Sequence, residues 1–422
     1  MSWERNQLAV MCEAVSIVEI ESRLCLSSGG KLNPSLLWLG AALFIWGIGE
    51  GMFFMFEPIY LQQLGADPIQ IGVILGGLGL VMTLAHIPAG YLSDRIGRRP
   101  VLIAGWVAGT VGALTMALAT SLTVFVAGIL LFSITAFVIS PLESYVTAAR
   151  RKWSVGRAIT YISMTFNAGA VIGPITGGWL GDRYGLRMVF FLAAGVFLVS
   201  TILIFPISHQ PRDPHNPNNP PAGLLTNGRY LGFLIIFFVA VFAAYLPQPL
   251  TPNFLQNQRG LSLTSIGQLD SIGGIGNTVL NLFLGQLNAR IGFILGQIGV
   301  VAFTTLLWRN TGFGWFALAY FLLGGFRALR ALGIAQVRPY VHESQMGLAY
   351  GIAETVGSST VLLAPPLAGY LYSRDPALMY PVALVLIGIS LAISIIRIPR
   401  SNRLESDHAI PYLSDEELTQ NL

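Results

Sequence analysis

Long apolar runs alternate with short polar stretches along most of the chain, from about residue 34 to about residue 400. A helix that crosses a lipid bilayer needs about 20 mostly apolar residues, and the pattern predicts twelve such helices. Their approximate ranges are 35–63, 68–90, 100–119, 122–148, 156–180, 187–207, 230–255, 264–287, 293–308, 313–338, 346–372 and 377–397. Several are rich in glycine, which membrane helices tolerate and which favours close helix packing. The pattern therefore predicts an all-α membrane protein with twelve transmembrane helices.

A polar segment between the sixth and seventh runs divides the helices into two sets of six. Residues 208–229, with the sequence SHQPRDPHNPNNPPAGLLTNGR, are too rich in proline and asparagine to continue a helix. They predict an extended cytoplasmic linker. We expect an N-terminal bundle over 34–207, a C-terminal bundle over 230–398 and a cytoplasmic tail over 399–422.

The first 33 residues are not predicted to belong to either bundle. Charged residues interrupt the apolar stretch of 1–33, and its uninterrupted core is too short for a signal peptide or a spanning helix. We expect a cytoplasmic segment. A short amphipathic helix, a disordered stretch and upstream sequence from a wrong start codon remain alternatives.

The distribution of arginine and lysine predicts the orientation of the helices, because cytoplasmic loops carry an excess of both residues. With the N-terminus in the cytoplasm, 19 of these residues fall on the inner side and 5 on the outer side. Both termini are therefore expected to be cytoplasmic. The short loops favour a prokaryotic inner membrane as the location.

The composition agrees with a membrane protein and excludes several functions. The chain is 54% hydrophobic and 10% charged, with a mean hydropathy of +0.65, whereas a soluble globular chain carries about 25% charged residues. A net charge of +4 with only two lysines does not suggest nucleic-acid binding. Cys12 and Cys25, the only cysteines, cannot build a disulfide framework or a zinc site by themselves.

The sequence contains no recognisable catalytic or nucleotide-binding pattern. A Walker-type Gly-x-x-x-x-Gly-Lys-(Ser/Thr) loop is absent, so ATP is not expected to be the direct energy source. Metal-ligand spacings and nucleophile–base arrangements are absent as well. We therefore expect neither enzyme activity nor a cofactor.

Two sequence echoes relate the halves of the chain. The stretch GYLSDRIGRRP at Gly90 resembles GQLNARIGFI at Gly285, an offset of 195 residues, although Asp94 becomes Ala289. A second echo has an offset of 191. It matches Gly156, Ala158, Pro174, Gly178 and Leu180 with Gly347, Ala349, Pro365, Gly369 and Leu371. Repeated membrane halves are typical of secondary transporters, with a binding site near the midplane between them, so we expect two pseudo-symmetric six-helix bundles.

Two motifs then point to a family. The loop after the second helix resembles the Gly-x-Leu-(Ser/Ala)-Asp-Arg-x-Gly-Arg-Arg signature of the major facilitator superfamily. The fifth helix carries GAVIGPITGG, which resembles the motif of exporters in this superfamily that exchange a solute for protons. Its residues are Gly169, Gly173, Pro174, Gly177 and Gly178. The resemblance covers about residues 34–400 and implies two six-helix bundles that rock about a central cavity, lined mainly by helices 1, 4, 7 and 10.

The resemblance also implies a conformational gate at the loop motif. Asp94 is expected against the amino end of the eleventh helix, where a helix terminus favours an anion, and Arg98 is expected to pair with Glu143. Such contacts would latch the outward-open form. The motif residues expected to act in this gate are Gly90, Asp94, Arg95, Gly97, Arg98 and Arg99. Arginines that only enforce topology, and a fifth-helix motif that only kinks the helix, remain alternatives.

Charged residues inside the membrane mark a candidate binding site, because a charge at the bilayer centre usually has a partner or a function. Glu50 in the first helix and Arg327 in the tenth should both lie near the midplane. We hypothesise that Glu50 binds a proton or a cationic solute. Arg327 would then either tune the pKa of Glu50 or bind an anionic group. A permanent Glu50–Arg327 pair is an alternative, and Arg330 is another possible partner.

Other side chains could complete this site. At helical spacing, Trp46, Glu50, Phe54 and Glu57 fall on one helix face. Aromatic residues of helices 7 and 10 could line a cavity for a lipophilic solute. These residues are Phe237, Phe242, Tyr245, Tyr320 and Phe326. Asp270 and Glu354 read as structural acids with local partners.

The leading prediction is a secondary active transporter that exports a small organic solute by alternating access, coupled to protons, as a monomer in contact with membrane lipid. One departure matters: many proton-driven exporters of this superfamily carry an arginine in the fourth helix, and this chain has none there. A facilitator or symporter for a sugar or other metabolite is therefore an alternative. A membrane sensor or scaffold that binds without transport is a second one.

Overall fold

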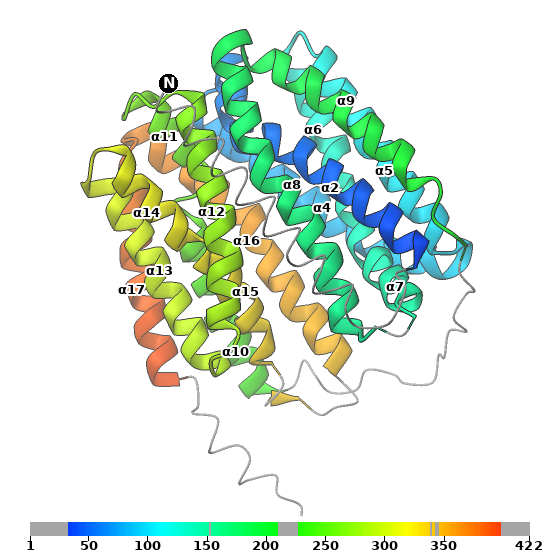
Figure 1. Ribbon diagram of the computed structural model, residues 1–422. Coiled ribbons are helices and arrows are strands. Elements are labelled where there is room, and N and C mark those ends of the chain that lie inside the picture. The colour runs from blue at the N-terminus through cyan, green and yellow to red at the C-terminus, as the bar shows by residue number, and fades with distance from the viewer. Residues whose placement is uncertain (1–32, 152, 210–226, 338–339, 342–345, 398–422) are drawn as a thin grey trace, which may run out of the picture.

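The structure is a computed structural model that describes residues 33–151, 153–209, 227–337, 340–341 and 346–397. Within these ranges it gives no account of the side chains of 86–95, 140, 155–156, 327–328 and 346–348. The described residues form helices and connecting turns, without strands. Figure 1 shows the helices of the first half, blue to green, on one side of the molecule and those of the second half, green through yellow to red, on the other.

The first half consists of eight α-helices and two short 3-10 helices in the described residues. They are α2 (Pro34–Phe53), η1 (Phe54–Phe56), α3 (Glu57–Gln63), α4 (Pro68–Ile96), α5 (Arg98–Leu118), α6 (Leu122–Ile134), η2 (Thr135–Val138), α7 (Ile139–Ala149), α8 (Val155–Tyr184) and α9 (Leu186–Ile204). Polar caps fix several starts: the Ser121 and Ser154 hydroxyls accept first-turn backbone N–H groups of α6 and α8. Gly97 and Gly185 have φ of 93° and 83°, a conformation that glycine adopts easily, and they separate α4 from α5 and α8 from α9.

The second half is built in the same way. Its helices are α10 (Gly228–Tyr245), α11 (Thr251–Asn257), α12 (Leu263–Leu284), α13 (Ala289–Arg309), α14 (Phe313–Leu323), α15 (Gly325–Ala335), α16 (Met346–Arg374) and α17 (Met379–Arg397). Asn227 and Ser262 cap the starts of α10 and α12 with side-chain oxygens.

Nine helical stretches within the described residues are long and apolar enough to cross a membrane. They are Pro34–Gln63, Pro68–Ala85, Arg98–Leu118, Leu122–Ala149, Arg157–Tyr184, Leu186–Ile204, Gly228–Tyr245, Ala289–Arg309 and Met379–Arg397. The other three predicted spans are also helical, as α12, α14 with α15, and α16. The expected all-α membrane protein is confirmed by these helices, and the count of twelve spans stays a prediction.

Four of the predicted spans are interrupted, whereas the sequence pattern predicted each as one continuous helix. The 3-10 turn η1 separates α2 from α3, and η2 separates α6 from α7. Residues 246–250, which include Pro247 and Pro249, separate α10 from α11, because proline cannot supply a helix N–H. Gly324 separates α14 from α15. The interrupted spans are the first, fourth, seventh and tenth, which the family resemblance assigns to the cavity lining.

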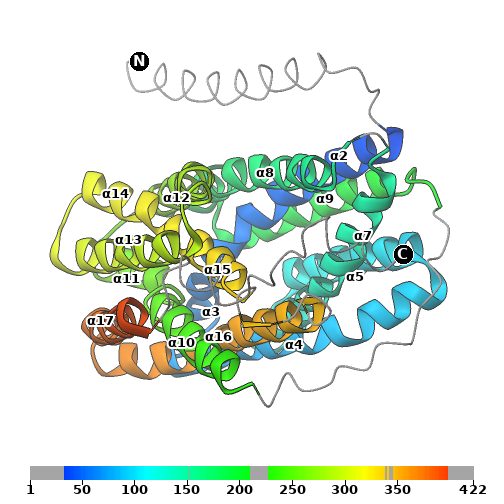
Figure 2. The same ribbon diagram turned by 90° about the horizontal axis from the view of Figure 1, so that it is seen from below.

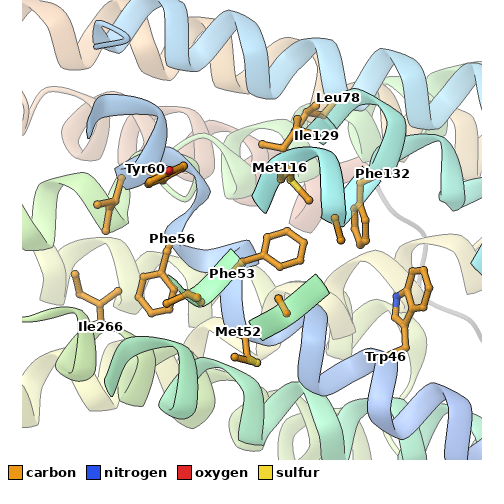
Figure 3. Packing of buried hydrophobic residues seen from close by; sticks show 14 of the residues in the cluster. Trp46, Met52, Phe53, Phe56, Tyr60, Leu78, Met116, Ile129, Phe132 and Ile266 are labelled. Carbon is orange, nitrogen blue, oxygen red and sulfur yellow. The ribbon is translucent and has the colours of Figure 1, made fainter. Parts of the chain in front are cut away.

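Aromatic side chains fill the interior of the first half around the interruption in α2 and α3. The ring centroids of Trp46 and Phe197 lie 4.6 Å apart, and those of Phe53 and Phe132 lie 5.3 Å apart. Figure 3 shows Trp46, Phe53 and Phe132 directed toward one another from α2 and α6. Phe53 is fully buried. These contacts hold the interrupted first span firmly against α6 and α9.

Two helix pairs, which we call the seams, join the halves: α4 packs against α16, and α8 packs against α12. Figure 2, a view along the bundle, shows the two seams on opposite sides of the molecule. In Figure 1, α8 and α12 lie close together near the top and diverge toward the bottom. The top is the end at which α3 and α11 end and α4 and α12 begin, and we call it the closed end.

Candidate functional site

The two seams contain equivalent contacts. In the first, a Cβ on Gly72 would clash with the carbonyl oxygen of Pro365. In the second, a Cβ on Gly267 would clash with the carbonyl oxygen of Pro174. Gly72 and Gly267 are 195 residues apart, and Pro174 and Pro365 are 191 apart. Since these are the two offsets of the sequence repeat, the seams are copies of one arrangement.

The equivalence continues one turn further along the helices. A Cβ on Gly76 of α4 would lie 2.7 Å from the carbonyl oxygen of Leu362. At the matching positions of the other seam, the hydroxyl of Ser271 donates to the carbonyl oxygen of Val171 at 2.7 Å. Ser271 is 2% exposed. Both seams therefore bring helix backbones together without large side chains between them, which small residues permit in membranes.

A polar contact between α3 and α11 completes the closed end. The Asn253 amide donates to the carbonyl oxygen of Pro58 at 3.0 Å and to Oε1 of Gln62 at 2.7 Å. The Asn257 amide donates to the same Gln62 oxygen at 2.9 Å. Asn253 is 1% exposed. The halves are thus joined there by packed backbones and by hydrogen bonds, of which the one from Asn253 to Pro58 is buried.

Charged side chains face the opposite end, where α7, α15 and α16 leave them accessible. Arg330 of α15 donates to Glu354 at 2.7 Å and to the Ser358 hydroxyl at 2.9 Å. The side chains of this ion pair are 33% and 53% exposed. The sequence predicted Glu50 as one candidate partner of Arg330. In the structure, Arg330 instead pairs with Glu354, which lies in the same half.

Arg98 and Glu143, which the sequence predicted to pair, line one cavity near the same end. It has a volume of about 550 Å³ and is lined by Arg98, Glu143, Ser144, Thr147, Ala148, Arg150 and Ile159. Glu143 is exposed. The structure therefore brings the two predicted gate residues of α5 and α7 to one opening.

The predicted residues of the first helix do not share one uniform face. The indole N–H of Trp46 donates to Oε2 of Glu50 at 3.0 Å, one turn away. Trp46 is 8% exposed and Glu57 is 4% exposed, whereas Phe54 is 58% exposed. The Phe54 N–H still donates to the Glu50 carbonyl oxygen, so Phe54 keeps the helical register with Glu50 and differs from Trp46 and Glu57 in its exposure. Glu50 and Glu57 thus lie on either side of the interruption.

The aromatic residues predicted for the cavity fall into two groups. Phe237 and Tyr320 are almost fully buried and belong to the interior of the second half. Tyr245 and Phe326 are partly buried and stack on each other, with ring centroids 5.9 Å apart. Phe242 is also partly buried and stacks on Phe238, with ring centroids 5.7 Å apart. These three partly buried side chains have the accessible faces that a solute would need.

The fifth-helix motif serves two partners at once. A Cβ on Gly169, Gly173 or Gly177 would clash with backbone carbonyl oxygens of α2, inside the first half. Gly178 and the carbonyl oxygen of Pro174 instead meet α12 across the second seam, while the Pro174 ring lies against Gly51 of α2. The same stretch of α8 therefore packs against α2 within the first half and against α12 at the closed end.

Several predicted gate residues lie outside the described side chains or act locally. The side chains of Asp94 and Arg95 are not described, nor are contacts of Gly90, and the same holds for the side chain of Arg327, which was predicted for the binding site. Arg99 contacts His209 Nε2 at 3.0 Å and donates to the carbonyl oxygen of Phe205 at 2.9 Å. Arg99 thus ties α5 to the end of α9 within the first half.

The sequence reasoning missed the polar side chains that link the halves, among them Asn253, Ser271 and one acid. Asp182 near the end of α8 accepts hydrogen bonds from the start of α12. Its only signal was an acid one turn after the fifth-helix motif. Among the described residues, no group of three or more His, Cys, Asp or Glu side chains could hold a metal ion.

A family model supports the resemblance seen in the sequence. The model of the Major Facilitator Superfamily matches residues 37–292 and 233–411. The tetracycline resistance protein of class B from Escherichia coli is 26% identical over 354 residues, which cover 78% of this chain and 86% of that protein. Multidrug resistance protein MdtG from Salmonella choleraesuis is 31% identical over 181 residues, or 42% of this chain and 44% of MdtG. The chain thus matches less than half the length of several curated relatives.

The fold is also that of solved transporters. The crystal structure of the nucleoside transporter NupG superposes with a TM-score of 0.71 and 16% sequence identity, over 86% of this chain and 98% of that chain. At this identity the likeness concerns the fold alone.

Proposed function

This chain belongs to the major facilitator superfamily of membrane transporters, and from that premise we propose that it is a secondary active transporter that exports a small organic solute in exchange for protons. The single observation that carries the proposal is the one-sided closure of the molecule. Two equivalent seams and the Asn253 contact join the halves at one end. Charged side chains are accessible at the other. A transporter that opens to one side at a time needs such an arrangement.

The proposal includes the arrangement of the chain in the membrane. Twelve helices form two pseudo-symmetric six-helix bundles, and the equivalent seam contacts support this symmetry. The excess of arginine and lysine in the loops supports cytoplasmic termini in a prokaryotic inner membrane. In that orientation the closed end faces outward and the cavity of Arg98 and Glu143 faces the cytoplasm. We propose that the protein works as a monomer.

The proposed solute site lies between the interrupted helices. Interrupted spans at matching positions of two halves are a good pointer to a transporter's binding site. Glu50 beside Trp46 is the proposed proton carrier, because a carboxyl group can bind or release a proton as its surroundings change. Arg330 with Glu354, and the stacked Tyr245 and Phe326, are proposed to contact the solute. The names of the curated relatives, which confer resistance to tetracycline and to several drugs, favour export.

Proton movement in inverted membrane vesicles tests the function directly. The vesicles carry the full chain and a pH-gradient dye, and drugs, organic cations and sugars are added one at a time. We expect one class of compound to trigger proton efflux and Glu50→Gln to abolish it. Asp375→Asn is the matched control, because Asp375 accepts only a local N–H in an exposed turn between α16 and α17.

The outcomes separate the proposal from its alternatives. Efflux that survives in Glu50→Gln would keep the exchange and remove Glu50 from it. Labelled sugar or metabolite that crosses without any proton signal would identify a facilitator. Specific binding without flux of any compound would identify a sensor or scaffold.

A further inference from the structure

The start of α12 is completed by a side chain from the other half of the molecule. The first N–H groups of a helix have no partner within the helix. Ser262 caps the N–H of Ser265, which leaves the N–H groups of Leu263 and Thr264 to be satisfied elsewhere. Asp182 of α8 accepts both, at 2.9 and 2.8 Å, and it accepts the Thr264 hydroxyl at 2.6 Å.

The equivalent helix start in the other seam is capped in a different way. The residue 195 positions before Leu263 is Pro68, which has no N–H to donate. The start of α4 is closed by its own neighbours: Gln70 N–H donates to Asp67 at 2.9 Å, and Asp67 N–H donates to Gln70 at 3.1 Å. This cap lies entirely within the first half.

The position that matches Asp182 carries no acid either. The residue 191 positions later is Ser373, whose hydroxyl donates to the carbonyl oxygen of Tyr370 at 2.8 Å, within its own helix. The two seams are therefore alike in their glycine contacts and different at their ends. Only the α8–α12 seam has a described carboxylate that bridges the halves.

We propose that Asp182 is a positioning residue that holds the closed end shut by serving as a removable cap for α12. This inference rests on the proposed alternation between two open states. When the closed end opens, α12 must leave α8, and the N–H groups of Leu263 and Thr264 lose their charged acceptor. Hydrogen bonds to a charged acceptor are stronger than neutral ones, so this contact favours the state seen here. At the closed end, the described residues of the α4–α16 seam meet through glycine contacts with the Pro365 and Leu362 carbonyl oxygens, without a charged hydrogen bond between the halves.

The geometry around the contact makes the cap sensitive to position. A Cβ on Gly178 would clash with the carbonyl oxygen of Leu263, and one on Gly181 would lie 2.9 Å from the Leu263 side chain. α8 therefore approaches the first turn of α12 closely enough for a short aspartate side chain to reach it. Because Asp182 is exposed, a glutamate there would keep the charge and have room to bend back toward the same N–H groups.

Double electron–electron resonance on the full chain in lipid nanodiscs measures the effect. Cys12 and Cys25 are replaced by serine, and spin labels are placed at Gln63→Cys and Thr311→Cys, which are exposed at the closed end in opposite halves. We expect Asp182→Asn to raise the ratio of open to closed distances about tenfold or more, because the charged acceptor is lost. Asp375→Asn, an aspartate in a turn at the same end, should leave the ratio unchanged.

The conservative variant separates a conformational role from a merely structural one. Asp182→Glu should return most of the closed population, which a loss of folding would not allow. If Asp182→Asn cannot be purified as a folded protein, Thr264→Val removes only the hydroxyl donor and should raise the ratio by about threefold. An unchanged distance ratio in the folded Asn variant, or in Thr264→Val where that replaces it, overturns the proposal.

The measurement also keeps this inference apart from the proposed function. The distances require no substrate and no proton gradient. A shifted ratio in a protein that moves no compound would support the removable cap and count against transport. Normal transport with an unshifted ratio in Asp182→Asn would support the transport function and count against the removable cap.

Discussion

At the scale of single residues, the sequence predicted which charged side chains belong to the candidate site but not which partners they contact. Glu50, Arg330 and Glu354 stood out because charges are rare in apolar helices. The pairing of Arg330 with Glu354 depends on how α15 lies against α16, and no local pattern encodes it. The polar contact of Trp46 with Glu50 follows the spacing of one helix turn and was within reach of the sequence.

Replacing Arg330 tests whether its ion pair serves stability or transport. The pair is partly exposed, and such pairs contribute only about 0.2–1 kcal/mol. We therefore expect Arg330→Gln to lower the free energy of unfolding by less than about 1 kcal/mol. Compound-triggered proton efflux should nevertheless be lost, because a positive charge of the proposed solute site disappears. Thermal unfolding and the vesicle measurement, made on one preparation, compare the two effects.

Arg374→Gln is the matched control for this variant. Arg374 is exposed at the closed end, where it contacts the Tyr370 hydroxyl at 3.4 Å within its own helix. Arg374→Gln should leave both the thermal unfolding and the compound-triggered proton efflux unchanged. If Arg330→Gln transports normally, Arg330 is not part of the site, and a large loss of stability would assign it a structural role instead.

At the scale of elements, the positions of the helices were predictable and their interruptions were not. The apolar runs mark each helix because the lipid interior requires apolar side chains. Gly324 and the pair Pro247 and Pro249 were visible signals, since both residue types break helices. The turn at Phe54–Phe56 has no such signal, as its three residues are all apolar. It forms in contact with the buried aromatic side chains of the first half.

The packing of α2 against α8 predicts how the fifth-helix motif contributes to stability. Gly177→Ala places a methyl group against the carbonyl oxygen of Met52, where no flexible side chain can give way. We expect a loss of about 1–3 kcal/mol, as for other overpacked interiors. The change is measured as a lower midpoint of thermal unfolding.

Gly195→Ala provides the comparison for Gly177→Ala. Gly195 lies in α9, and a Cβ there would meet nothing within 4 Å. Because alanine favours helix more than glycine does, this variant should be neutral or more stable by up to about 1 kcal/mol. Equal destabilisation by both variants would mean that the α2–α8 contact has no special role.

At the scale of the whole molecule, the offsets of the internal repeat also relate residues that the two sequence echoes did not include. The echoes at Gly90 and Pro174 gave the two offsets, and the seams follow the same offsets at Gly72 and Gly267. Which seam carries the removable cap was not predictable. It depends on Asp182 meeting a helix start that is distant in the sequence.

The equivalence of the seams predicts equal responses to equivalent substitutions. Gly72→Ala and Gly267→Ala each place a methyl group against a proline carbonyl oxygen and should force the closed end apart. If each costs the closed state about 1.4 kcal/mol, the ratio of open to closed distances rises about tenfold. The spin labels at Gln63→Cys and Thr311→Cys measure this ratio.

Gly77→Ala is the control in the same helix. A Cβ at Gly77 would meet nothing within 4 Å, so the distance ratio should match that of the unmodified chain. A response from only one of the two seam glycines would show that the molecule closes through one seam alone.

The contact between Asn253 and Pro58 bears on the history of the chain. These residues occupy matching positions, 195 residues apart, so each half meets its own counterpart at this point. In a two-fold symmetric dimer, a residue on the axis contacts the identical residue of the partner. A single ancestral half, before a duplication fused two copies into one gene, would have closed on an identical molecule through two identical seams. The acid at Asp182 and the serine at Ser373 record a divergence that only the fused gene permitted, because a symmetric dimer cannot change one seam without the other.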